Sequence, residues 1–225
     1  MSRSNSSIVL LVLLFALLSV TACPNACSRF LEEVVAASHQ HSPPNEFYPL
    51  TEAIRANDLE KVEELVSGGV DEPDQLGGYP LLLAIALHHN DIFHLLMEID
   101  ADIDVRCGMN LSALHIAAMQ NNVHAIEKLL EAGMPVDILG FDSPNDGPTS
   151  STPLHMACQM EDDEAYDAVE ALIAAGADVN ALTSVRNGLY RRSPLYWARR
   201  EGNSQIADLL LKHGATEYPD GAARN

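Results

Sequence analysis

Basic side chains are scarce in this chain of 225 residues, where 13 lysines and arginines stand against 32 aspartates and glutamates and the formal net charge is -19. Nucleic acids and anionic lipid surfaces would repel a protein of this charge, so neither is expected as its general partner. The charge is also uneven: residues 46–104 hold fourteen acidic and two basic residues, whereas five arginines lie between positions 186 and 200. Another protein with a basic surface is the partner that this charge favours.

Motifs for common chemistry are also lacking. The sequence has no glycine-rich phosphate loop, no nucleophile elbow and no zinc-protease helix. The acidic run from Glu161 to Asp167 lacks the glycine and the alternating ligands of a calcium loop, so we expect it to be a solvated loop. Two groups of histidines are close in sequence but match no recognised ligand spacing: His39 and His41, and His88, His89 and His94. Neither a metal site nor a cofactor is predicted.

No apolar run is long enough to span a bilayer comfortably. The thirteen-residue stretch from Ile8 to Val20 is apolar apart from Ser19, follows Arg3 and precedes small residues. This arrangement is typical of a secretory signal, which we expect to occupy residues 1–22.

The end of this signal contains the four residues Val20, Thr21, Ala22 and Cys23. They resemble the lipobox of bacterial lipoproteins, which implies that the Cys23 thiol is diacylated and that the mature chain begins there. Ordinary cleavage after Ala22 is the alternative, and Cys23 could then form a disulfide with Cys27. Both alternatives place the mature protein in a bacterial envelope, and the first anchors it to a membrane through Cys23.

The stretch from Thr152 to Asn180 reads TPLHMACQMEDDEAYDAVEALIAAGADVN. Thr152 can cap exposed backbone amides and Pro153 fits the first helical position, so a helix is expected to start here. Gly176 readily takes the left-handed conformation that ends helices. Before it, three apolar residues at helical spacing predict a second helix: Val169, Leu172 and Ile173.

The same pattern occurs in five copies along the chain, including the one from Thr152. The copies begin with YPLTEAI from Tyr48, YPLLLAI from Tyr79, SALHIAA from Ser112, TPLHMAC from Thr152 and SPLYWAR from Ser193. Four copies end in glycine, at Gly69, Gly133, Gly176 and Gly214, and Asp100 takes this position in the second copy. A TPLH start and a GADVN finish in repeated copies resemble the ankyrin repeat, a helix pair followed by a projecting turn.

The resemblance implies an all-α fold, a solenoid of about five helix-turn-helix repeats over residues 46–217. The repeats lie near 48–78, 79–111, 112–151, 152–192 and 193–217. Residues 23–45 are expected to hold the lipid-anchor site, an amphipathic capping helix and a linker, and residues 218–225 a tail. The resemblance gives His115 and His155 a structural role, hydrogen bonding to neighbouring backbone, and Cys158 is expected to be a small buried side chain.

The last two full repeats are longer than one repeat requires. The surplus lies at residues 140–151 and around residues 183–192, where turn-forming residues predict extended fingers. Insertions in solenoids often lie on the binding face, which makes Phe141, Tyr190 and Arg191 candidates for partner contact. Neutral lengthening of a loop is the alternative, since it has little effect on stability.

Ankyrin-like solenoids bind partners along the first helices of their repeats. The resemblance implies that the positions late in each first helix are exposed; the candidates are Leu87, Met119, Gln120, Gln159, Met160 and Arg200. Leu87, Met119 and Met160 would form an apolar stripe of the kind found at interface centres. The alternative is that these side chains pack against the bases of their own fingers.

The repeat pattern covers most of the mature chain and leaves little sequence for a catalytic pocket, so no enzyme activity is predicted. We interpret the chain as a protein-binding module of the bacterial envelope that scaffolds or protects an envelope protein. One alternative is an immunity or inhibitor protein that neutralises a secreted toxin or lipase. Another is a binder of a small ligand or metal.

Overall fold

The computed structural model describes residues 49–66, 79–107, 110–143, 147–161, 163–185 and 190–217. All of them belong to one unit, Pro44–Asn225. The predicted signal, Cys23, the capping helix, the linker and the tail lie outside the described residues. The described elements are α3 (Pro49–Arg55), α4 (Leu59–Leu65), α5 (Pro80–Ala86), α6 (Asn90–Glu98), α7 (Ala113–Met119), α8 (Val123–Glu131), β1 (Gly140–Ser143), β2 (Gly147–Ser151), α9 (Pro153–Ala157), α10 (Tyr166–Ala174), β3 (Thr183–Val185), β4 (Tyr190–Arg192), α11 (Pro194–Glu201) and α12 (Ser204–Lys212).

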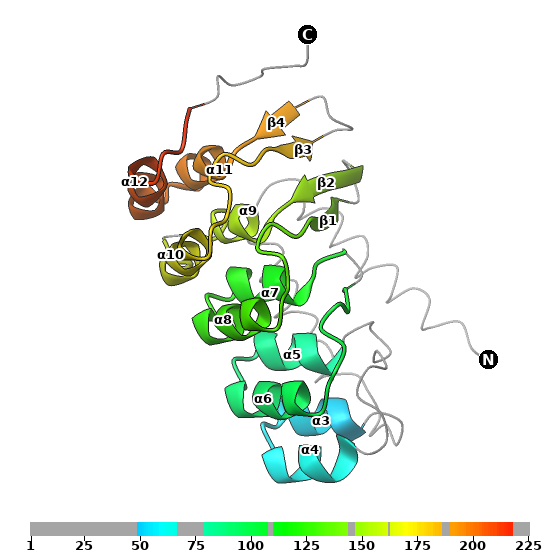
Figure 1. Ribbon diagram of the computed structural model, residues 1–225. Helices are drawn as coiled ribbons and strands as arrows, with labels where there is room; N and C mark the ends of the chain where they lie inside the picture. Colours follow the sequence, from blue (N-terminus) through cyan, green and yellow to red (C-terminus); the bar gives the residue numbers. More distant parts are fainter. Residues whose placement is uncertain are drawn as a thin grey trace, which may run out of the picture. The chain divides into compact units, whose positions relative to one another are not determined.

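The helices form five consecutive antiparallel pairs that stack in two rows (Figure 1). In one row each first helix contacts the next, in the order α3, α5, α7, α9 and α11. In the other row the second helices contact one another in the order α4, α6, α8, α10 and α12. The predicted stack of five helix-turn-helix repeats is therefore confirmed in the described part of the chain.

The first helices begin as the sequence predicts. Thr152 and Ser112 have extended backbones at the N-cap, and both form a capping box with the histidine three residues later. The Ser193 side chain accepts a hydrogen bond from the Tyr196 amide, and Pro153 and Pro194 occupy the first turn, where no amide partner is needed. These groups satisfy amides that would otherwise be left without partners at the helix starts.

The second helices end in the left-handed backbone conformation that the glycines predict. Gly133, Gly176 and Gly214 have φ of 96°, 90° and 88°. Asp100 has φ of 59° at the equivalent position of the second pair, so it adopts the same conformation despite its side chain. This prediction is confirmed for these four repeats, and Gly69 lies outside the described residues.

Two second helices are capped by side chains of the preceding repeat. Ala165, the N-cap of α10, has no side chain that could accept a hydrogen bond; instead Asn121 Oδ1 accepts from the Ala168 amide at 2.7 Å. In the same way the Asp163 carboxylate accepts from the Ile206 amide at 3.0 Å, near the start of α12. A side-chain cap generally stabilises a helix by about 0.5 to 2 kcal/mol. Each of these caps therefore also couples one repeat to the next.

The two predicted fingers form two-stranded antiparallel hairpins. In the first, β1 pairs with β2, with Gly140 opposite Ser151; in the second, β3 pairs with β4, with Thr183 opposite Arg192. The hairpins lie side by side, because β2 contacts β3, and they project beside the row of first helices (Figure 1). The fingers are thus a second stacked layer and are not separate loops.

The core lies between the two helix rows. Its largest fully buried side chains include Ile54, Phe93, Leu114 and Leu154. Cys158 is also fully buried, as predicted, and burial raises the pKa of its thiol, so that the side chain stays protonated. None of the described helices has the length and apolar character needed to cross a membrane.

Candidate protein-interaction surface

The histidines of the TPLH pattern are structural tethers. His155 Nδ1 accepts from the Thr152 amide at 3.2 Å, so this nitrogen carries no proton and Nε2–H is the donor. His155 Nε2–H donates to the carbonyl oxygens of Ala181 at 3.1 Å and Arg192 at 3.2 Å, at the base of the second hairpin. The imidazole therefore ties the start of α9 to the chain entering the next repeat.

His115 makes the same connection one repeat earlier. Its Nδ1 accepts from the Ser112 amide, and its Nε2–H donates to the Ser151 carbonyl at 3.1 Å. Burial lowers the pKa of His115 and of His155 to about 4, and both stay neutral near pH 7. The structural role predicted for both histidines is confirmed.

The predicted apolar stripe across the first helices is not exposed as expected. Met119 is only 3% exposed, because α7 contacts first helices on both sides and also packs against α8 and α10. All seven residues of α7 are buried. The expectation that Met119 is exposed is therefore wrong.

Met160 is likewise only 5% exposed. It follows α9, and the Asn203 amide group of the next repeat donates to its carbonyl and to that of Cys158. This connection holds the loop after α9 against α12, and the side chain of Met160 turns into the protein. The expectation that Met160 is exposed is also wrong.

The other predicted first-helix positions are accessible to different degrees. Leu87, Gln120 and Gln159 are half-buried, and Arg200 is exposed. In the second hairpin Arg191 is exposed. The backbones of Phe141 and Tyr190 lie in β1 and β4, but their side chains lie outside the described residues. The partner-binding role of all these residues stays a prediction.

Exposed carboxylates are dense on the first two helix pairs, and we call this region the acidic surface. Its ten exposed carboxylate residues, among the described residues up to 104, are Glu52, Asp58, Glu60, Glu63, Glu64, Asp91, Glu98, Asp100, Asp102 and Asp104. In the same part of the chain Lys61 is exposed and Arg55 is half-buried. The surface potential here is therefore strongly negative.

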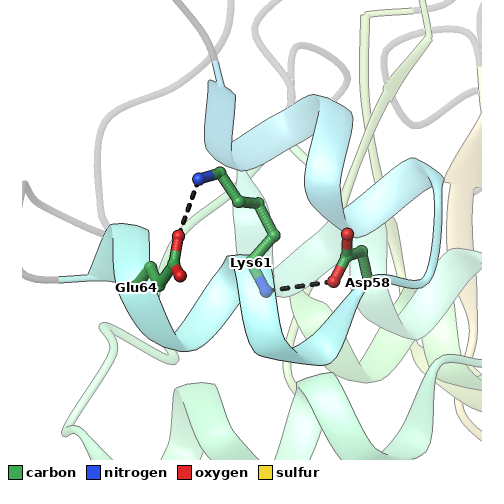
Figure 2. A network of polar contacts seen from close by, with 3 residues as sticks. All are labelled: Asp58, Lys61 and Glu64. Carbon is green, nitrogen blue, oxygen red and sulfur yellow. Dashed lines mark hydrogen bonds and ion pairs between the residues drawn. The ribbon is translucent and has the colours of Figure 1, made fainter.

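The exposed lysine of this surface is engaged by acidic neighbours (Figure 2). Its Nζ lies 2.7 Å from Glu64 Oε2, and its backbone amide donates to Asp58 Oδ1 at 3.0 Å, which caps α4. The hydrogen bond to Glu64 and the charge of Glu64 raise the pKa of Lys61. The positive charge of Lys61 is thus paired with a carboxylate of its own helix, and the acidic surface stays strongly negative.

The basic end of the chain is organised around α11. The Arg192 guanidinium lies 4.2 Å from the centroid of the Tyr196 ring, and that of Arg200 lies 5.0 Å from the Trp197 ring. Arg199 forms an ion pair with Glu217 at 2.7 Å. The two ends of the stack therefore differ in charge and in composition.

Of the histidines that are close in sequence, His39 and His41 lie outside the described residues, and His88, His89 and His94 form no group that could hold a metal ion. His88 is exposed and adopts φ of 57° in the loop between α5 and α6. His94 instead meets His124, thirty residues further on, with an Nε2–Nε2 distance of 2.5 Å. Within the described ranges no group of three or more His, Cys, Asp and Glu residues could hold a metal ion.

Comparison with known proteins places these repeats in a family. Residues 105–183 match the family described as ankyrin repeats (3 copies), and residues 190–220 match a further ankyrin repeat. The helix pairs within the matched residues are ankyrin repeats, and the all-α fold of five stacked pairs is that of an ankyrin-repeat solenoid. This fold is generally a non-catalytic one that binds other proteins.

Several larger proteins share the repeats. Ankyrin repeat and SOCS box protein 11 of Danio rerio is 34% identical over 114 residues, which cover 51% of this chain and 32% of that protein. Ankyrin repeat and MYND domain-containing protein 1 of Homo sapiens is 30% identical over 175 residues, covering 72% of this chain and 18% of that protein. The p105 subunit of nuclear factor NF-kappa-B of Gallus gallus is 29% identical over 181 residues, which cover 77% of this chain and 17% of that protein. The chain thus spans less than a third of these relatives.

Proposed function

We propose that the acidic surface of the first two repeats binds a basic surface of another protein, and that the chain performs no catalysis itself. The ten exposed carboxylates of the acidic surface carry this proposal. Charges of one sign on a rigid stack of helices attract a complementary surface and accelerate the encounter. The half-buried side chain of Leu87, at the C-cap of α5 in the second repeat, would add an apolar contact.

The proposed setting is the bacterial envelope. The signal-like segment over residues 1–22 and the lipobox ending at Cys23 support export and lipid anchoring. A protein held there with a strongly acidic face would scaffold or protect a basic envelope protein. If Cys23 carries the anchor, the full chain fractionates with membranes and the Cys23→Ser variant does not.

A second candidate function is inhibition of a secreted toxin or lipase. The same acidic surface would then cover a basic active-site entrance of that enzyme. The two functions differ in the activity of the bound partner. An inhibitor abolishes the activity of the enzyme that it captures, whereas a scaffold leaves it intact.

The experiment is an affinity capture from the native envelope with three forms of the full chain. The first is the wild type, and the second carries Glu60→Lys, Glu63→Lys and Asp91→Lys on the acidic surface. The control carries the same change of charge at exposed positions of the last two repeats: Glu164→Lys, Glu170→Lys and Asp208→Lys.

We expect the wild type and the control to retain a basic protein that the acidic-surface variant loses by about tenfold or more, since like charges that face each other cost several kcal/mol. Added salt should weaken the capture as well. Equal recovery with both variants would contradict the proposal and would move the site to the hairpins or to the arginines around α11.

A further inference from the structure

Two histidines from neighbouring second helices face one another. His94 lies on α6 and His124 on α8, and these helices pack side by side. Their Nε2 atoms are 2.5 Å apart, and the ring centroids are 4.6 Å apart with an angle of 57° between the planes. Both side chains are half-buried, so solvent reaches the pair.

The pair is held in place by a buried aromatic ring. Phe93 is fully buried and lies against both imidazoles, with ring centroids 6.1 Å from His94 and 6.5 Å from His124. The edge-on contact with His124 and the tilted contact with His94 restrict the orientation of each ring. Both Nε2 atoms therefore converge on one point before any ligand is present.

This convergence has a simple chemical meaning. A neutral imidazole has one N–H and one nitrogen lone pair, so at this distance one Nε2–H donates to the other Nε2. If the proton of the donor moves to its Nδ1, both Nε2 atoms offer lone pairs and neither ring changes its charge. A cation that prefers imidazole can then take the place of the shared proton.

We propose that His94 and His124 bind one divalent transition-metal ion of the zinc, nickel or copper class through their Nε2 atoms. Metal–nitrogen bonds of about 2.0 to 2.1 Å require the two nitrogens to separate to roughly 3 Å, which small side-chain rotations achieve. Imidazole suits these metals, whereas magnesium and calcium prefer oxygen ligands. Water or a carboxylate of a bound partner completes the coordination.

Such a site would act as a cross-link between the second and third repeats. His94 and His124 are thirty positions apart, and an unfolded chain does not hold them together. A metal that binds the folded state raises the unfolding temperature by mass action. This site is independent of the acidic surface, because it needs no partner protein.

The experiment measures the unfolding temperature of the full chain in ZnCl₂, with MgCl₂ as the probe that should have no effect. For a domain of this size we expect a rise of about 5 to 10 °C at a zinc concentration of 100 times Kd. The variants His94→Gln and His124→Gln should each lose most of this rise. The matched control is His213→Gln, which removes an exposed histidine at the end of α12. This variant should show the same zinc-dependent rise in unfolding temperature as the wild type.

Histidine side-chain NMR provides a second measurement that does not depend on unfolding. Zinc should shift the Nε2 resonances of His94 and His124 together and leave those of the buried His115 and His155 unchanged. An equal temperature rise in the wild type and in both site variants would overturn the proposal. So would the absence of any zinc-dependent shift at these two rings, or a shift confined to other histidines.

Discussion

Replacing Leu114 with alanine is expected to lower the free energy of unfolding by about 2 to 5 kcal/mol. Leu114 and its equivalent in the next repeat, Leu154, are both 0% exposed and lie in consecutive first helices that pack on each other. Removing either side chain leaves a cavity between repeats that stabilise one another mainly through contact. Leu154→Ala should therefore have an effect of the same size.

Urea unfolding at neutral pH measures this effect, with Leu139→Ala as the control. Leu139 is 56% exposed, and its replacement should change the free energy of unfolding by less than about 0.5 kcal/mol. A loss below about 1 kcal/mol for Leu114→Ala would mean that the repeat register described here does not place this side chain in the core.

The second large effect is a loss of stability in mild acid caused by His115 and His155. Burial lowers the pKa of both to about 4, whereas an unfolded histidine has a pKa of about 6.5. At pH values between about 4 and 6.5 the unfolded chain therefore binds more protons than the folded chain. The stabilisation that these neutral histidines provide is thus complete above about pH 6.5 and decreases as the pH falls towards 4.

The size of this effect follows from the shift. At 1.36 kcal/mol per pKa unit, each histidine contributes about 2 to 3 kcal/mol that is lost by pH 4.5. Many carboxylates also titrate in this range, and a lower net charge reduces repulsion in the folded state, so the wild type alone does not isolate the histidines.

The variant that isolates them is His115→Gln combined with His155→Gln. Glutamine three residues after Ser112 or Thr152 can still accept from the N-cap amide, so the capping boxes are kept, but it does not titrate. The wild type should be the more stable protein at pH 7, and its advantage should shrink as the pH falls to 4.5. Urea unfolding at several pH values measures this difference. An advantage that stays constant from pH 7 to 4.5 would contradict the assignment of neutral, buried histidines.

The helices and their ends could be predicted because the signals are local. Proline in the first turn, threonine at the N-cap and glycine at the helix end act within a few residues of where they stand, as Pro153, Thr152 and Gly176 show. Even Asp100, which lacks the freedom of glycine, takes the left-handed conformation that its place in the repeat requires. Recurrence in five copies then made each local signal more specific.

Burial at the ends of the first helices was harder to predict. Met119 was expected to face a groove, but α7 reads ALHIAAM and its one polar residue is the buried tether His115. A helix that is apolar on all sides is typical of a fully enclosed position, and this signal could have identified Met119 as buried. For Met160 no such signal exists: it follows the end of α9, and its backbone carbonyl is held by Asn203 of the next repeat, 43 residues further along the chain.

The hairpins and the pairing of His94 with His124 also depend on contacts between repeats. The first finger, residues 140–151, is rich in glycine, proline and serine, which have low strand propensity, and its strand β2 is supported by its neighbour β3. His94 is the fifth residue of α6 and His124 the second residue of α8, so they are not equivalent positions of the repeat, and only the stacking of the helices reveals that their rings meet. Sequence spacing alone grouped His94 with His88 and His89.

The measurement that tests the central claim most directly is amide hydrogen exchange of the chain with and without the basic protein that it captures. If the acidic surface is the binding site, exchange slows in peptides from α3 to α6 and is unchanged around β3, β4 and α11. Protection that is confined to the hairpins and α11, with none in the first two repeats, would contradict the account and place the partner at the arginine-rich end.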